Sequence, residues 1–205
     1  GTECINGDCV LSAGNCQDET GYISLNGDDY LYDNDPCSPA SCVDGEVVMA
    51  VIDCAPCADN ETAVYSDGVC CPECVGPPVA LFYSEYAEGS SNNKYFEIYN
   101  PSDETVDLAY YSFSNCSNGC DDWEYNTSFA DGATIAPGSV YTVCHSSFAG
   151  DQTLCSETRT LYHNGDDAQG LMHVSGLLDV IGDVATSGDE WDVAGVSNAT
   201  KDHTL

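Results

Sequence analysis

The sequence predicts an all-β protein, a β-sandwich of short strands preceded by a small disulfide-rich module. Three observations predict it. From residue 80 onward, short segments of alternating or β-favouring side chains are separated by turn residues at the spacing of a sandwich. Ten of the 14 cysteines lie in residues 1–75. The segment 75–79 holds two adjacent prolines, which form a short, stiff joint. We therefore expect modules at 1–75 and 80–205, joined by a Pro-rich 76–79.

Cysteine content determines the reading of the first module. Its cysteines are even in number and accompanied by no histidine, so disulfides are favoured over zinc, although Cys54–Cys57 and Cys71–Cys74 have the spacing of zinc knuckles. Such a density of cysteine indicates an oxidising, extracellular location, either secreted or at the cell surface. Strands are predicted at 22–25 and 46–52. The module has too little apolar material for an ordinary core, so disulfides must constrain the chain.

The cysteine spacing resembles a von Willebrand factor type C module. The resembling features are Cys16, Asp35-Pro36-Cys37, Cys42, Asp44-Gly45-Glu46-Val47, Cys54–Cys57 and the ending Cys70-Cys71-Pro72-Glu73-Cys74. The family usually carries two further cysteines, in regions where this chain has Ser41 and Val48-Met49. The resemblance implies disulfides among eight cysteines whose partners spacing does not assign: Cys16, Cys37, Cys42, Cys54, Cys57, Cys70, Cys71 and Cys74. It also implies a small extra loop closed by Cys4 and Cys9.

The second module begins with two strands, 81–86 and 95–99, joined by a polar loop and ended by Asn100-Pro101. Glu85 and Glu97 lie inside these strand patterns, either facing outward or buried with a partner such as Lys94. Further strands are predicted at 105–113, 123–129, 133–136, 139–144, 158–162, 168–174, 177–181, 191–196 and 200–205. The simplest cysteine pairings are Cys116 with Cys120 and Cys144 with Cys155, each linking one connection.

This region resembles the lamin-tail domain, an immunoglobulin-like β-sandwich found in nuclear lamins and many secreted proteins. The resembling motifs occur in the family's order: 84–100, Ile135-Ala-Pro-Gly-Ser-Val140, Asn164-Gly165-Asp166-Asp167-Ala168, Asp179-Val-Ile-Gly182, and Trp191 with 200–205. Both resemblances imply interaction modules and not catalysts. Lamin-tail-like domains also accompany extracellular hydrolases, which implies an alternative function.

The charge is strongly acidic, with 35 Asp and Glu against three Lys and Arg. Such a surface excludes nucleic-acid binding and repels anionic membranes. No apolar run approaches the roughly 18–20 residues that a membrane span needs. Oxygen-rich loops favour divalent cations, and Asp166 and Asp167 are the candidate Ca²⁺ ligands. The same Asn-Gly-Asp-Asp sequence is also favoured in turns for backbone reasons alone.

N-linked glycans are predicted at four sequons, Asn60, Asn115, Asn126 and Asn198. No catalytic motif occurs, and none of the four histidines has a metal-protease spacing, so we expect no enzyme activity. A metal site at His163 competes with an ordinary strand-end histidine. The predicted function is a structural subunit of an extracellular filament, appendage or matrix, with other protein subunits, copies of itself among them, or glycans as partners. The alternative is a binding or adhesion region of a larger secreted enzyme.

Overall fold

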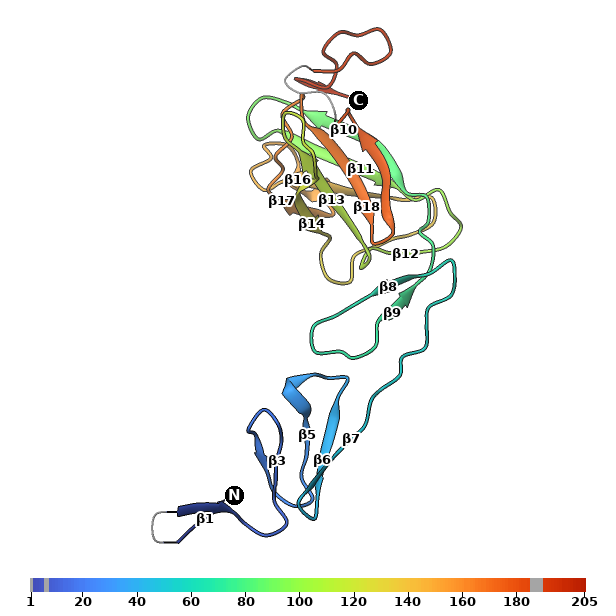
Figure 1. Ribbon diagram of the computed structural model, residues 1–205. Coiled ribbons are helices and arrows are strands. Elements are labelled where there is room, and N and C mark those ends of the chain that lie inside the picture. Colours follow the sequence, from blue (N-terminus) through green and yellow to red (C-terminus); the bar gives the residue numbers. More distant parts are fainter. Residues whose placement is uncertain (1, 6–7, 185–189) are drawn as a thin grey trace. The chain divides into compact units, whose positions relative to one another are not determined.

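The computed structural model describes residues 2–5, 8–184 and 190–205, with side chains from Leu11 onward (Figure 1). It is built of short strands with two brief 3-10 turns, η1 (Tyr32–Asn34) and η2 (Gln152–Leu154). The chain divides into two compact units, Gly1–Gly76 and Pro77–Leu205. Within the described ranges, no helix has the length and apolar character needed to cross a bilayer.

The described part of the N-terminal unit contains nine short strands. They form the pairs β1 (Thr2–Ile5) with β2 (Asp8–Leu11), β3 (Cys16–Gln17) with β4 (Ile23–Ser24), and β8 (Thr62–Val64) with β9 (Glu73–Val75), and the three-stranded sheet β5 (Asp29–Leu31), β6 (Pro39–Val43), β7 (Glu46–Met49). The strand predicted at 46–52 is regular only over Glu46–Met49. Its pairing continues in single bonds, because the backbone N–H groups of Ala50 and Ile52 donate to Pro39 and Cys37.

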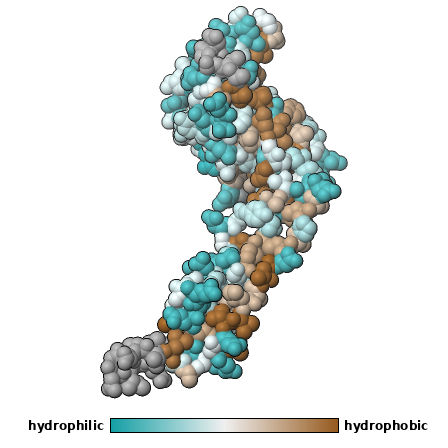
Figure 2. Space-filling model, in the orientation of Figure 1, coloured by the Kyte–Doolittle hydropathy of each residue, from teal (hydrophilic) through white to brown (hydrophobic). Residues whose placement is uncertain are grey.

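The described apolar core of this unit is very small. The buried side chains counted as hydrophobic are Cys16, Ala40, Cys42 and Val75, and two of these are cysteines joined to each other. Several apolar residues stay exposed instead, Val51 by 82%. Figure 2 shows apolar patches between hydrophilic areas on the visible face of both units. Cross-links, and not burial, must therefore account for most of the order of this unit.

Two main sheets form the second unit. The first has the order β17 (Glu157–Arg159), β16 (Val140–His145), β11 (Lys94–Tyr99), β10 (Phe82–Glu88), β20 (His203–Thr204). The second has the order β14 (Glu124–Ser128), β13 (Tyr111–Cys116), β18 (Ala168–His173), β19 (Gly176–Ile181). A small pair, β12 (Val106–Asp107) with β15 (Thr134–Ile135), completes the described sheets. All pairings are antiparallel except β16 with β17.

The core lies between the two main sheets. On β11 the side chains alternate, so that Phe96 and Ile98 are fully buried while Tyr95 and Glu97 face the other side. Aromatic rings connect the layers, with ring centroids 5.0 Å apart for Phe96 and Phe113 and 5.7 Å apart for Phe129 and Tyr141. Asp179 of β19 also joins the sheets, because its carboxylate accepts a 2.8 Å hydrogen bond from the backbone N–H of Tyr83 on β10.

In the second unit, the strands predicted at 158–162 and 200–205 are shorter, at Glu157–Arg159 and His203–Thr204, and two other predicted strands differ more. The segment 105–113 contains β12 and the start of β13, separated by a turn in which the Asp107 carboxylate accepts from the N–H of Ala109. This local side-chain bond competes with continued extension. The segment 191–196 forms only an isolated bridge between Val193 and Val196.

Candidate functional site

The Asn164–Asp167 loop is held by hydrogen bonds within it and by bonds from Asn118 and Thr200. Asp167 is buried, and its carboxylate accepts from the backbone N–H of Asn118 at 2.8 Å. With its amide nitrogen turned toward the acids, Asn164 donates to Asp166 and, at 2.8 Å, to Asp167. Burial raises the pKa of Asp167. Neither aspartate belongs to a described cluster of three or more potential metal ligands, and Ca²⁺ at Asp166 and Asp167 stays a prediction.

His163 belongs to a buried polar cluster beside this loop. Its Nε2 lies 3.3 Å from the carbonyl oxygen of Ala87, and its carbonyl oxygen accepts from Lys94. Lys94 also forms a buried ion pair with Glu88 at 3.2 Å, and the second Glu88 oxygen accepts from the backbone N–H of Asp202. Burial lowers the pKa of His163 to about 4. The imidazole is therefore neutral at physiological pH, and the cluster ties the C-terminal segment to β10.

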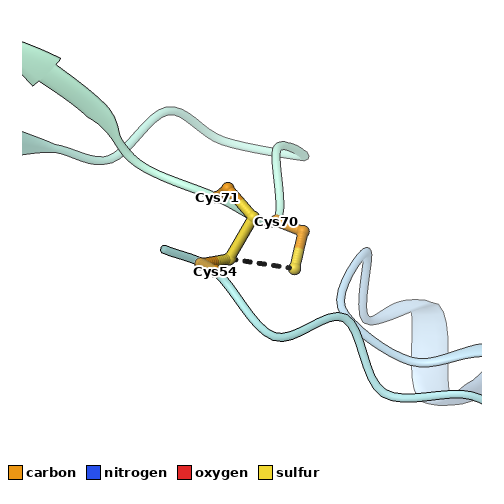
Figure 3. A group of neighbouring side chains, drawn as sticks. All are labelled: Cys54, Cys70 and Cys71. Carbon is orange, nitrogen blue, oxygen red and sulfur yellow. Dashed lines mark hydrogen bonds between the residues drawn. A yellow bond between two sulfur atoms is a disulfide. The ribbon is translucent and has the colours of Figure 1, made fainter. Parts of the chain in front are cut away.

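The cysteines of the N-terminal unit pair as Cys16–Cys42, Cys37–Cys70, Cys54–Cys71 and Cys57–Cys74. Two of these bonds lie close together, with the sulfur of Cys70 3.9 Å from that of Cys54 (Figure 3). The two described groups of potential metal ligands both consist of these cysteines, with Glu61 in one of them. Disulfide sulfur is not a thiolate, so these groups do not fit a metal.

Each disulfide of the sandwich links a single connection. Cys116 is bonded to Cys120 and Cys144 to Cys155 in the sandwich. The backbone register of β1 and β2 places Cys4 opposite Cys9. Their side chains lie outside the described residues, so the Cys4–Cys9 bond stays a prediction.

The four sequons differ in exposure. Asn60, Asn126 and Asn198 are exposed. Asn115 is only 3% exposed, and its amide donates to Ser117, the third residue of its own sequon, at 2.9 Å. A glycan on Asn115 does not fit the folded sandwich, because the amide nitrogen that would carry it is packed inside.

A groove of about 390 Å³ lies on the face of β10, β11 and β16 that points away from the core. Its floor is a row across three strands, in which Glu85 lies opposite Glu97 and Glu97 lies opposite Thr142. Tyr95 donates to Glu85 at 2.6 Å, and Ser84 donates to Glu97 at 2.8 Å. Burial, followed by the Glu85 carboxylate, raises the pKa of Tyr95 to about 12, so the phenol stays a donor.

The connection between Cys144 and Cys155 forms the wall of this groove. Phe148 packs edge-on against Tyr95, with 5.7 Å between ring centroids. Leu154 also lines the groove and is 74% exposed. Gly150 lies so close to the Phe148 ring that a Cβ atom there would be 2.5 Å from it. Glycine at this position therefore lets the connection fold tightly around the ring.

A β-bulge creates the acidic floor. The β10–β11 register shifts between Tyr83 and Glu85, which leaves Ser84 as the extra residue. Tyr83 can then face the core and contact Phe96 with 5.3 Å between ring centroids, while Glu85 faces the groove. Uninterrupted period-2 alternation would have placed Tyr83 and Glu85 on one face. The sequence does not indicate the groove, because no turn or glycine residue marks this bulge.

A family model describes most of this unit. The Lamin Tail Domain model matches residues 77–188, more than half of the chain. The chain belongs to the lamin tail domain family. Within this lamin tail domain lie the groove, the buried Lys94–Glu88 pair and the Asn164–Asp167 loop.

The chain also shares sequence similarity with part of a much longer human protein. The chain is similar to the extracellular matrix organizing protein FRAS1 of Homo sapiens, with 32% identity over 88 residues. The matched region is 42% of this chain and 2% of that much longer protein.

Proposed function

We propose that this lamin tail protein is a non-catalytic structural subunit of an extracellular assembly, a filament, appendage or matrix, that works through protein–protein contacts. The observation that carries the proposal is the similarity to a protein described as organizing the extracellular matrix. Six described disulfides support the extracellular location, because such bonds persist in oxidising compartments. Neither the lamin tail match nor the similarity to FRAS1 favours the alternative, a binding region of a larger secreted enzyme.

We also propose that the N-terminal unit is a module of the von Willebrand factor type C kind that serves the same structural function. Its four described cross-links join segments up to 33 residues apart in a unit with little core. A rigid cross-linked unit of this kind suits a long life outside the cell. Exposed Asn60, Asn126 and Asn198 would carry N-linked glycans without disturbing either unit.

Contacts between copies of the chain must overcome a formal charge of −32 on each. Each of the three Lys and Arg residues pairs within the chain, Lys94 with Glu88, Arg159 with Glu157 and Lys201 with Glu190. Self-assembly would therefore need screening salt or divalent cations between acidic surfaces. Ca²⁺ is the cation that we propose for this role.

The test is the mass of natively purified protein by light scattering, in Ca²⁺ and then in EDTA at matched ionic strength. We expect large assemblies in Ca²⁺ that dissociate in EDTA. Assemblies that persist in EDTA would keep the structural function and remove Ca²⁺ from the contacts. A monomer in both buffers, also after addition of extracellular matrix extract, would overturn the proposed function.

A further inference from the structure

The acidic groove on the outer face of β10, β11 and β16 has the negative charge needed to bind a cation. Glu85 and Glu97 are half-buried and lie directly opposite each other on adjacent strands. Like charges in this relation destabilise a sheet. Their donors inside the chain are neutral hydroxyl groups, from Tyr95 and Ser84. Among the described lining residues there is a third acid, Asp151, and no Lys, Arg or His.

The cation that fits must have an apolar body. The wall of the groove presents the Phe148 ring, the exposed Leu154 side chain and the Cys144–Cys155 disulfide. A bare metal ion gains nothing from these surfaces, and Ca²⁺ takes six to eight oxygen ligands. An arginine side chain fits both features, because its planar guanidinium binds carboxylates through several N–H groups and stacks on aromatic rings.

The charge of the chain decides whose arginine this is. A second copy would bring the same large negative charge, and its Lys and Arg side chains are already paired with glutamates. A basic partner protein is instead attracted by the field of the whole surface before it reaches the groove. Charge complementarity therefore favours a different protein over a copy of this chain.

We propose that this groove binds an extended segment of a basic partner protein, with an arginine between Glu85 and Glu97 and a neighbouring apolar side chain against Phe148 and Leu154. The inference rests on the proposed function, since it names the class of partner through which the chain would act. The groove takes one arginine and its neighbours, and the acidic surface around it supplies long-range attraction.

The probe is the peptide acetyl-Gly-Val-Arg-Val-Gly-amide, added to the ¹⁵N-labelled full chain in EDTA at low salt. The matched control peptide carries citrulline in place of arginine, which keeps the shape and removes the charge. We expect the arginine peptide to shift the amide signals of Glu85, Glu97 and Thr142, and the citrulline peptide to leave them unchanged. Shifts spread over the acidic surface, or equal binding of both peptides, would overturn the proposal.

Charge-neutralising variants distinguish peptide binding in the groove from general electrostatic attraction to the acidic surface. The double variant E85Q/E97Q should weaken the arginine peptide about tenfold or more, as expected when two close charge partners are removed. D103N/E104Q removes two exposed acids outside the groove and should change the affinity by less than about twofold. Equal weakening by both double variants would contradict a built site.

Two further measurements keep the proposal falsifiable. L154A truncates an exposed side chain and so leaves the fold intact, and it should weaken the peptide if the apolar wall takes part. Ca²⁺ that produces the same shifts without peptide, and loses them in E85Q/E97Q, would assign the groove to a metal ion instead. If the peptide fails while large assemblies still form, this inference falls and the proposed function stands. Specific peptide binding by a protein that never assembles would overturn only the proposed function.

Discussion

Glu85 of β10 lies directly across from Glu97 of β11, so two carboxylates face each other on one sheet surface. Each accepts a hydrogen bond from a neighbouring hydroxyl group, Tyr95 for Glu85 and Ser84 for Glu97. These bonds hold the carboxylates in place without neutralising them. The pair is thus a local cost in stability that a bound cation would relieve.

Neutralising one member of this pair should stabilise the free protein. E97Q keeps an oxygen that accepts from Ser84 and removes the repulsion of Glu85, so we expect a gain of about 0.2–1 kcal/mol in the free energy of unfolding. Chemical denaturation, followed through the unfolding transition of the sandwich, measures this gain, and E104Q is the control at an exposed position. A loss of stability in E97Q relative to E104Q would show that the two carboxylates do not repel each other.

Breaking the buried ion pair should have the opposite effect. K94M leaves Glu88 buried without its cation, which we expect to cost about 3–5 kcal/mol. The double variant K94M/E88Q removes both charges and keeps an acceptor for the Asp202 N–H, so it should recover a large part of the loss. The measurement is the denaturant midpoint of all three proteins. Equal losses in the single and double variants would contradict a charge effect.

Acid should destabilise the sandwich through His163. Its pKa is lowered to about 4 by burial, so between the ordinary pKa near 6.5 and about 4 the unfolded chain binds a proton that the folded chain does not. Stability is therefore full above pH 6.5 and falls as the pH drops, by on the order of 3 kcal/mol near pH 4. H163Q should show a shallower fall in unfolding free energy over this range. The opposing contribution of Asp167 is present in both proteins, and parallel curves would refute the assignment.

Reducing agent should affect the two units differently. The N-terminal unit buries few apolar side chains and depends on four described disulfides, whereas the sandwich has a core of 13 buried residues. We expect dithiothreitol to unfold residues 1–76 and to leave the sandwich folded. Limited proteolysis with mass mapping reads this out. A sandwich that is cleaved as fast as the N-terminal unit would show that Cys116–Cys120 and Cys144–Cys155 are essential to it.

Glycan occupancy should follow side-chain exposure. Protein secreted from a glycosylating cell should carry glycans at Asn60, Asn126 and Asn198 and none at Asn115, whose amide is inside the sandwich. Peptide mass mapping after enzymatic deglycosylation gives the occupancy of each site. Full occupancy of Asn115 in folded protein would mean that the local packing of β13 is different.

Much of this protein follows from its sequence alone. Short strands between turn residues predicted the β-sandwich, and the order of motifs from Ser84 to Leu205 predicted the lamin tail domain that the family model then showed over residues 77–188. The crowding of cysteines before Gly76 predicted a disulfide-rich unit. These features depend on local spacing and composition, which a sequence displays directly.

Only the tertiary structure decided which acids meet and how the eight cysteines from Cys16 to Cys74 pair. The bulge at Ser84 reverses the face of Glu85 relative to Tyr83, and Lys94 pairs with Glu88 across the hairpin rather than with Glu85 or Glu97. Cys37 pairs with Cys70, 33 residues away. Such choices depend on how distant segments pack, because an extra residue in a strand or a contact between sheets changes every neighbour without leaving a mark in local composition.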